Sequence, residues 1–473
     1  MSIVSTIADA GSRALDGLGQ LAAVVTGGDL RLGVTGLRRS GKTVFVTSLV
    51  NNLLAAGLRP GDAGHLAQLN ARGRILASRL DPQPDGAVPR FDYERHLADL
   101  AAEPPRWPDP TRAVSEIRVS LRFAPSGWMR RRVQDQATLN LDIVDYPGEW
   151  LMDLPLLRED FDAWSRKTLE LSRRPPRAAL AAPWLEMLAA TDPRAPYEEA
   201  TARRLAEAYT AYLHACRSSA VGLSLLQPGR FLEPGEMAGA PVLTFCPLPP
   251  GTSPPGSLAA QMEARFEGYK EKVVRQFFRE HFARLDRQIV LVDVLGALNA
   301  GAEGLEDLER SLATTLEAFN HGRPTWLSWL GGARIDKVLF AATKADHVAA
   351  AEHANLKSLT ESFLAGPLNA LRFSGAAVEC KAIASVKCTE SVTAEHEGRP
   401  LPCVKGIPEG RDRPTVLFPG AVPPDRSWIG PAEQGRFRFE PFRPPPGVGR
   451  DGRGLPTIRL DQALDFLIGD RLE

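Results

Sequence analysis

One stretch of eight residues constrains the fold of this chain more than any other: GLRRSGKT, at residues 36–43. A loop that binds phosphate needs a strand before it, a helix after it, and glycines where backbone N–H groups converge on oxygen atoms. Residues 30–36 read as a short buried strand, and the helical pattern that begins at Lys42 closes at Gly57. The octet in this frame predicts a nucleotide-phosphate loop in an α/β fold.

The side chains of this loop have distinct predicted roles. Lys42 is expected to reach the β- and γ-phosphates, and the Thr43 hydroxyl is expected to bind Mg²⁺. Arg38 and Arg39 stand at loop positions where glycines are common. Two interpretations stay open: one of the two side chains reaches the transition state of phosphoryl transfer, or both stay hydrated at the surface. Lys42 and Arg38 are candidate catalytic residues. The predicted nucleotide-binding residues of the loop are Gly36, Arg39, Ser40, Gly41, Lys42, Thr43 and Val44.

A second stretch, LNLDIVDYPGEW at residues 139–150, reads as an apolar strand that ends in Asp145. A carboxylate at the C-terminal end of a strand beside a phosphate loop is where Mg²⁺ needs a partner. Gly148 can offer its N–H to a γ-phosphate because no side chain stands in the way. Glu149 follows, where Gln often orients the attacking water. Two interpretations stay open: Glu149 positions the nucleophile, or it is a surface or hinge residue.

A third stretch predicts which base is bound. IDKVLFAATKADHV, at residues 335–348, is a buried strand that ends in Thr343, Lys344 and Asp346. The Asp346 carboxylate can accept hydrogen bonds from guanine N1–H and the exocyclic amine, neither of which adenine offers. The Lys344 stem can lie along the purine face. A fourth strand, at residues 377–390, ends in a loop where a backbone N–H can hold guanine O6; that loop contains Ser385, Val386 and Lys387.

A switch threonine that binds Mg²⁺ is expected between the first helix and the DYPG strand. Thr111 precedes an alternating strand at about residues 114–123 and is the predicted residue, whereas Thr138 lies too deep in the next strand. The segment 57–106 enlarges this first switch region and contains a predicted helix at residues 93–102.

The order of these motifs resembles that of a Ras-like GTPase, over pieces of roughly half the chain. Thr343 stands where Asn is commoner in that family. The phrases VDYPGEWLMDLPLL, LLQPGRF, LVDVLGALN and LFAATKADHV look like the YcjX-like family of bacterial P-loop NTPases, and this resemblance spans most of the chain. It implies a GTP-binding core with a large helical insertion and a link with the stress response.

The remaining sequence suggests how the chain is divided. We expect a mostly parallel sheet with helices on both faces, plus an inserted all-helical domain. Residues 258–285 form a strong amphipathic pattern, and their apolar stripe is either the core of a helical subdomain or a groove for a partner. The predicted division is 1–150 and 286–395 for the GTP-binding domain, 151–285 for the helical insertion, and 396–473 for a Pro-rich extension with short strands and a closing helix at 460–470.

Composition limits the function classes. Lys plus Arg and Asp plus Glu both number 57, so the net charge of zero gives no electrostatic case for a nucleic-acid partner. The five cysteines form no metal-binding pattern, which favours buried free thiols in a reducing cytoplasm. No apolar run approaches the roughly 20 residues of a membrane span. An apolar helical face within residues 3–21 can pack on the protein core or contact a membrane surface.

These observations predict a Mg²⁺-dependent GTPase that binds GTP and GDP and acts as a slow conformational switch. Nucleotide state at DYPGE can move the insertion and thereby engage an unknown protein partner. Two alternatives stay open: an interaction module that binds nucleotide with negligible turnover, and an ATPase that happens to contain TKAD.

Overall fold

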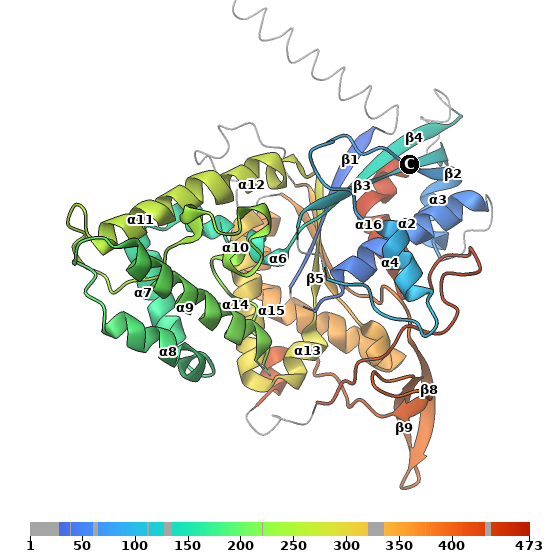
Figure 1. The fold of residues 1–473 in the computed structure, drawn as a ribbon. Helices are drawn as coiled ribbons and strands as arrows, with labels where there is room; N and C mark the ends of the chain where they lie inside the picture. The colour runs from blue at the N-terminus through green and yellow to red at the C-terminus, as the bar shows by residue number, and fades with distance from the viewer. Residues whose placement is uncertain are drawn as a thin grey trace, which may run out of the picture.

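The computed structural model describes residues 28–37, 39–59, 65–110, 113–126, 135–219, 221–319, 335–373, 375–430 and 437–473. Seven strands form the central sheet in the order β2-β3-β4-β1-β5-β6-β7 (Figure 1). The five strands from β4 to β7 in this order are parallel, and β3 and β2 extend the sheet in antiparallel fashion. The strands are β1 Asp29–Gly36, β2 Gly73–Asp81, β3 Ser115–Pro125, β4 Ala137–Asp145, β5 Arg287–Val292, β6 Lys337–Ala342 and β7 Ala377–Ala382.

Both faces of the sheet are covered, because the central strands are apolar on both sides. Along β5, Ile289 and Leu291 pack into one core, whereas Val290 and Val292 pack into another. Such continuous burial is typical of parallel strands between two helical layers. The first face carries α2 Lys42–Leu58, α3 Ala67–Arg72, α4 Tyr93–Leu100 and α16 Leu460–Leu472, and the second carries α13 Val294–Asn299, α14 Gly301–Phe319 and α15 His353–Phe373.

Between β4 and β5 the described chain is almost entirely helical; we call residues 148–285 the helical insert. Its main helices gather on one side of the sheet, at the left of Figure 1. They share an aromatic core in which Trp164 stacks on Phe266, with ring centroids 4.9 Å apart. Its elements are α6 Gly148–Leu151, a 3₁₀ turn Leu154–Arg158, α7 Phe161–Ser172, α8 Arg177–Ala189, α9 Glu199–Ser218, α10 Gly229–Leu232, α11 Leu258–Tyr269, a π-helical turn Lys270–Val274, α12 Arg275–Glu280, and 3₁₀ turns Gly235–Met237, Pro241–Leu243 and Phe282–Arg284.

The chain after β7 forms a second, smaller sheet in the order β10-β9-β8. Its hairpin projects from the molecule, at the bottom of Figure 1. The closing helix α16 then returns to the first face of the central sheet. The strands are β8 Thr389–His396, β9 Arg399–Gly406 and β10 Thr415–Leu417.

The predicted α/β class, with a mostly parallel sheet and an inserted helical region, is confirmed. The apolar stripe of residues 258–285 is core: Met262, Phe266, Tyr269, Val273 and Phe277 are all buried. The amphipathic helical pattern is helical without a break over residues 258–280, where a π-helical turn joins α11 to α12, and the helix ends at Glu280 rather than at residue 285. All five cysteines are buried free thiols. The boundaries at 150, 285 and 395 stay predictions, and β8 runs across the last of them.

Candidate functional site

A cavity of about 840 Å³ lies at the C-terminal ends of the parallel strands. We call it the phosphate-loop cavity. Because the carboxyl ends of parallel strands meet at one edge, loops far apart in sequence converge there. Of the predicted site residues, it is lined by Gly36, Arg39, Ser40, Gly41, Lys42, Thr43, Val44, Gly148, Glu149, Thr343, Lys344, Asp346, Ser385 and Val386.

The loop between β1 and α2 is built for close backbone approach. Gly41, the N-cap of α2, has φ 78°, a left-handed conformation that glycine adopts without strain. A Cβ on Gly36 would lie 2.1 Å from Ser40 Oγ, and one on Gly148 would lie 2.4 Å from the Gly36 carbonyl oxygen. The phosphate loop and the DYPG turn therefore touch at a point that admits no side chain.

Polar groups in this region lack protein partners. The hydroxyls of Thr35 and Ser40 are buried, and neither has a hydrogen-bond partner among the residues that the structure describes. A buried hydroxyl without a partner is costly, so such groups indicate a ligand or ordered water. Together with the N-terminus of the 17-residue helix α2, they favour an anion at the loop.

The Lys42 side chain extends from the phosphate loop to the C-terminal end of β4. Its Nζ is 2.9 Å from Asp145 Oδ1 and donates to the Tyr146 carbonyl oxygen at 2.8 Å. Asp145 is fully buried at the end of β4 and does not line the cavity, although Lys42 does. The ammonium and the carboxylate thus lie next to the loop that would hold phosphate, in a setting with little solvent to screen them.

These side chains fit a magnesium ion bound together with a nucleotide. Thr43 is buried in the first turn of α2, and its hydroxyl is of the kind that such ions bind beside a phosphate. No cluster of three His, Cys, Asp or Glu residues that could hold a metal occurs in the described ranges. Mg²⁺ usually keeps several waters and takes phosphate oxygens, so one hydroxyl and one carboxylate are a sufficient protein contribution.

The other end of the cavity contains the TKAD loop. Asp346 is buried, and its Oδ2 accepts a hydrogen bond from the backbone N–H of Cys388 at 2.8 Å. Burial, with a further contribution from Asp346, raises the pKa of the Cys388 thiol, so the thiol stays protonated. Lys344 has φ 60°, and its Nζ contacts Asp293. The loop after β7 therefore braces the carboxylate that is expected to read the base.

Two predicted residues cannot be placed, and two others, Asp145 and Lys387, do not line the cavity. Arg38 and Thr111 lie outside the described residues, although Pro110, directly before Thr111, lines the cavity. Lys387 is exposed, and its backbone N–H donates to the Pro456 carbonyl oxygen at 2.7 Å. The C-terminal segment therefore occupies one of the backbone amides of the loop that was expected to hold guanine O6.

Sequence reasoning missed several residues of the cavity. Asp293 follows β5 directly, so the rule that ligands bind at the C-terminal ends of parallel strands could have found it. Arg217 of the insert and Phe439 and Phe442 of the C-terminal segment carry no local signal, because only tertiary packing brings them there. The Trp107 indole N–H donates to the Phe442 carbonyl oxygen at 3.0 Å and so connects two of the segments that line the cavity.

The DYPGE turn packs directly on the insert. A Cβ on Gly229 would lie 2.3 Å from the Glu149 carbonyl oxygen, so α10 touches the turn backbone to backbone. The buried Asp153 carboxylate accepts hydrogen bonds from Gly229 N–H at 2.9 Å and from the Tyr269 hydroxyl at 2.6 Å. Burial raises the pKa of Asp153 to about 7. Movement of Gly148 or Glu149 would therefore be passed to α10.

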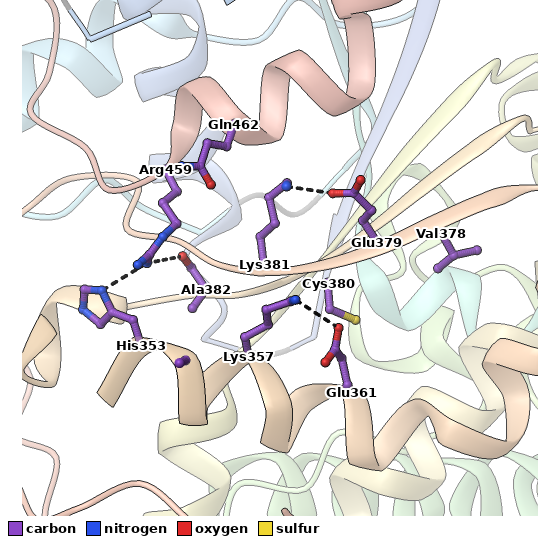
Figure 2. Close-up of a pocket in the computed structure, with 11 residues that line it drawn as sticks. His353, Lys357, Glu361, Val378, Glu379, Cys380, Lys381, Ala382, Arg459 and Gln462 are labelled. Carbon is purple, nitrogen blue, oxygen red and sulfur yellow. Dashed lines mark hydrogen bonds and ion pairs between the residues drawn. The ribbon is translucent and has the colours of Figure 1, made fainter. Parts of the chain in front are cut away.

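A second cavity, of about 540 Å³, lies beside the edge strand β7, between α15 and α16 (Figure 2). We call it the edge cavity. Lys381 lies 2.7 Å from Glu379, and Lys357 lies 3.5 Å from Glu361. Arg459 contacts His353 Nδ1 at 3.0 Å and donates to the Ala382 carbonyl oxygen at 3.2 Å. Lys357, Lys381 and Arg459 thus each have an acid or an acceptor beside them, whereas His353 Nε2 is buried without a hydrogen-bond partner among the described residues.

No helix in the described ranges combines the length and apolar character needed to cross a membrane. The fold is mixed α/β with a mostly parallel sheet, as in Ras-like P-loop proteins. Two of the known proteins to which the chain is similar are each named Ras-like GTPase YcjX. The protein from Escherichia coli (strain K12) is 42% identical over 452 residues, which cover 94% of this chain and 96% of that one. The protein from Shewanella oneidensis is 37% identical over 467 residues, with 94% and 95% covered. The model of the YcjX-like family, DUF463, matches residues 30–472, and the chain belongs to that family.

Proposed function

We propose that this protein is a Mg²⁺-dependent GTPase that hydrolyses GTP to GDP. The observation that carries the proposal is the convergence of the phosphate loop, the DYPG turn and the TKAD loop on one cavity. The names of the two relatives, each a Ras-like GTPase, support the same activity. The proposal keeps two expectations from the sequence: a cytoplasmic location, from the free thiols, and a stress-related process, from the family resemblance.

In this proposal the phosphates lie against the N-terminus of α2. Backbone N–H groups of the loop and the Gly148 N–H hold phosphate oxygens, because Gly36 and Gly148 leave the backbone accessible. Lys42 turns from Asp145 to the β- and γ-phosphates. A bound Mg²⁺ would neutralise phosphate charge. Thr43 and Asp145 would hold it, with Thr111 as a predicted third residue outside the described ranges.

Hydrolysis then needs only positioning and charge stabilisation. A water oxygen attacks the γ-phosphorus in line, the bond to the β–γ bridging oxygen breaks, and GDP leaves with that electron pair. The proton of the water passes to the phosphate released. Glu149 lines the cavity beside Gly148, where it can accept a hydrogen bond from the attacking water.

The base would be read at the other end of the cavity. Asp346 accepts from guanine N1–H and the exocyclic amine, and the Lys344 stem lies along the purine. Ser385 and Val386 line this end, and the wall is completed by Phe439 and Phe442. We therefore assign the C-terminal segment a part in base recognition.

The direct test incubates the purified protein with equal GTP and ATP plus Mg²⁺ and follows all four nucleotides by chromatography. Selective conversion of GTP to GDP is expected. Preferential loss of ATP would contradict the guanine assignment and make the protein an ATPase.

A second candidate function is a nucleotide-gated interaction module with negligible turnover. The backbone contact of Glu149 with Gly229 favours it, since that contact links nucleotide state to the insert, through which a protein partner would bind. GTP that stays bound and uncleaved, while protease sensitivity of the insert differs between GTP and GDP, would establish this function instead.

A further inference from the structure

The helical insert contributes one cation to the phosphate-loop cavity. Arg217, in the last turn of α9, lines that cavity together with Glu233. The two side chains form an ion pair at 2.6 Å, with exposed fractions of 24% for Arg217 and 16% for Glu233. Arg217 also lines a small recess with Leu37 and Glu149. It therefore lies between the phosphate loop and the DYPGE turn, which are the two segments expected to surround a γ-phosphate.

The end of α9 is fixed to the core of the protein. The carboxylate of Asp307, on α14, pairs with the buried Arg177 at 2.8 Å and accepts a hydrogen bond from the backbone N–H of Ser224 at 2.5 Å. Arg177 also donates to the Leu225 carbonyl oxygen at 2.8 Å. These contacts hold the segment after α9 against the sheet domain, so Arg217 is supported by a rigid frame.

Arg217 differs from the other cations that line the cavity in the described ranges. Lys42 is held by Asp145 and by the Tyr146 carbonyl oxygen, and Lys344 is held by Asp293 at the base end. Arg39 is exposed. Arg217 is mostly buried, and its partner Glu233 also belongs to the insert. Exchange of that carboxylate for a phosphate oxygen would leave the guanidinium with an anionic partner.

The chemistry of the proposed reaction needs such a group. Negative charge is distributed over the γ-phosphate oxygens in the transition state, and the Glu149 carboxylate beside Gly148 adds to it. A guanidinium can donate to two oxygens at once and is permanently charged. We propose that Arg217 is a catalytic arginine that the insert supplies within the same chain, and that Glu233 holds it when no triphosphate is bound. This inference rests on the proposed GTPase function and names a residue of the same site.

Arg217 takes no proton and forms no bond to phosphorus in this proposal. It donates hydrogen bonds to γ-phosphate oxygens as the bond to the bridging oxygen breaks, and it leaves the attacking water to Glu149. An arginine in this role stabilises the transition state more than the ground state. Its loss should therefore lower the rate of hydrolysis while leaving GDP affinity unchanged.

The test measures single-turnover GTP hydrolysis by the full-length protein with Mg²⁺, together with GDP affinity and formation of a GDP–aluminium fluoride complex. Arg217→Ala is expected to slow hydrolysis by about 10³-fold and to abolish the fluoride complex. Arg217→Lys is expected to lose most of the rate as well, because an ammonium lacks the planar fork. Arg203→Ala, on the same helix with a side chain 63% exposed, is the matched control and should hydrolyse like wild type.

Glu233→Gln separates catalysis from structure. It breaks the same ion pair but leaves the guanidinium in place and removes the carboxylate that competes with phosphate for it, so its rate should exceed that of wild type. An equal loss of rate in Arg217→Ala and Glu233→Gln would overturn the proposal and show that the pair is structural. Wild-type turnover that persists in Arg217→Ala would overturn this inference alone. A wild-type protein that binds GTP but neither hydrolyses it nor forms the fluoride complex would overturn the proposed hydrolysis and the inference together.

Discussion

The phosphate-loop cavity and the edge cavity are both lined by lysine and arginine, yet they differ in whether their polar groups already have partners. In the edge cavity, Lys357, Lys381 and Arg459 already have acceptors or acids beside them (Figure 2). In the phosphate-loop cavity, the lining residue Ser40 has a buried hydroxyl without a partner among the described residues, and so does Thr35 in the strand before the loop.

The difference teaches that charge alone does not define a site. A cavity whose cationic side chains are paired gains little when an anion enters, because each new contact replaces an existing one. A cavity with unpaired hydroxyls, a helix N-terminus and glycines in close approach gains hydrogen bonds when an anion enters. Paired substitutions in the two cavities test this difference directly.

The largest effect is expected at the base end. Asp346→Asn should reduce the preference for GTP over ATP by up to about 10⁴-fold, because an amide cannot accept from both guanine donors. The fold should be kept, since the Asn oxygen can still accept from Cys388 N–H. Competitive binding of labelled GTP against ATP measures the preference. Glu361→Gln in the edge cavity is the control, and equal selectivity in the two variants would refute the assignment.

A smaller effect is expected for the lysine pair. Lys42→Ala should weaken GTP binding by about 10- to 150-fold, because hydrogen bonds to charged groups contribute about 1.5–3 kcal/mol. Lys357→Ala should leave binding unchanged, since that side chain is half exposed and pairs with Glu361. Fluorescent GTP titrations compare the two variants. Similar losses in both would show that the distinction between the cavities is wrong.

The next comparison is between a glycine with no room for a side chain, Gly148, and a glycine that faces open space, Gly86. Gly148→Ala places a Cβ 2.4 Å from the Gly36 carbonyl oxygen and should cost about 1–3 kcal/mol of stability as well as GTP affinity. Gly86→Ala faces open space and should change stability by no more than about 0.5 kcal/mol. Denaturant unfolding measures both. An unaffected Gly148→Ala protein would mean that the two loops separate freely.

The last comparison concerns two titratable groups, Asp153 in the insert beside the DYPGE turn and His353 in the edge cavity, whose contributions to stability should have opposite pH dependence. Burial raises the pKa of Asp153 from 3.8 to about 7. The native state therefore keeps the Asp153 proton at pH values where the unfolded state has lost it, so the stabilisation that Asp153 contributes falls as pH rises towards 7. Burial, and then Arg459, lower the pKa of His353 below 6.5, so this contribution is lost as pH falls through 6.5. For each of these two groups, the free energy of unfolding changes by at most about 1.4 kcal/mol per pH unit.

Unfolding from pH 5 to 8 checks these signs. The stability of wild type relative to Asp153→Asn should decrease as pH rises towards 7, whereas its stability relative to His353→Gln should increase from pH 5 to 6.5. If the two stability differences changed with pH in the same direction, the opposite protonation preferences of Asp153 and His353 would be contradicted.

Much of the fold was predictable because its signals are local. The strand before Lys42, the strands before Asp145 and Thr343, and the closing helix α16 each have a clear pattern and a clear end. Strand β2 was missed because its exposed edge carries arginine and serine, which weakens the alternation. The π-helical turn was missed because it shifts the helical period by one residue, without a marker in the sequence.

The candidate site was predictable to the extent that its residues lie in contiguous motifs. The phosphate loop, the DYPG turn and the TKAD loop each combine several functional residues within a few positions. Arg217 and Phe442 reach the cavity through long-range packing, and an arginine near the end of a polar helix looks like any solvated charge. Lys387 illustrates the converse: it lies in the expected loop, but Pro456 takes its amide.

The pairing of the C-terminal segment with the loop after β7 has a consequence for synthesis of the protein. Ala384 and Ile458 exchange backbone hydrogen bonds, and α16 begins just after them. A ribosome therefore releases the phosphate loop long before the segment that pairs with the loop after β7, because the two are several hundred residues apart. Nascent chains would lack this pairing, so under the proposed function they should bind guanine nucleotide less tightly than chains that contain residues 437–458.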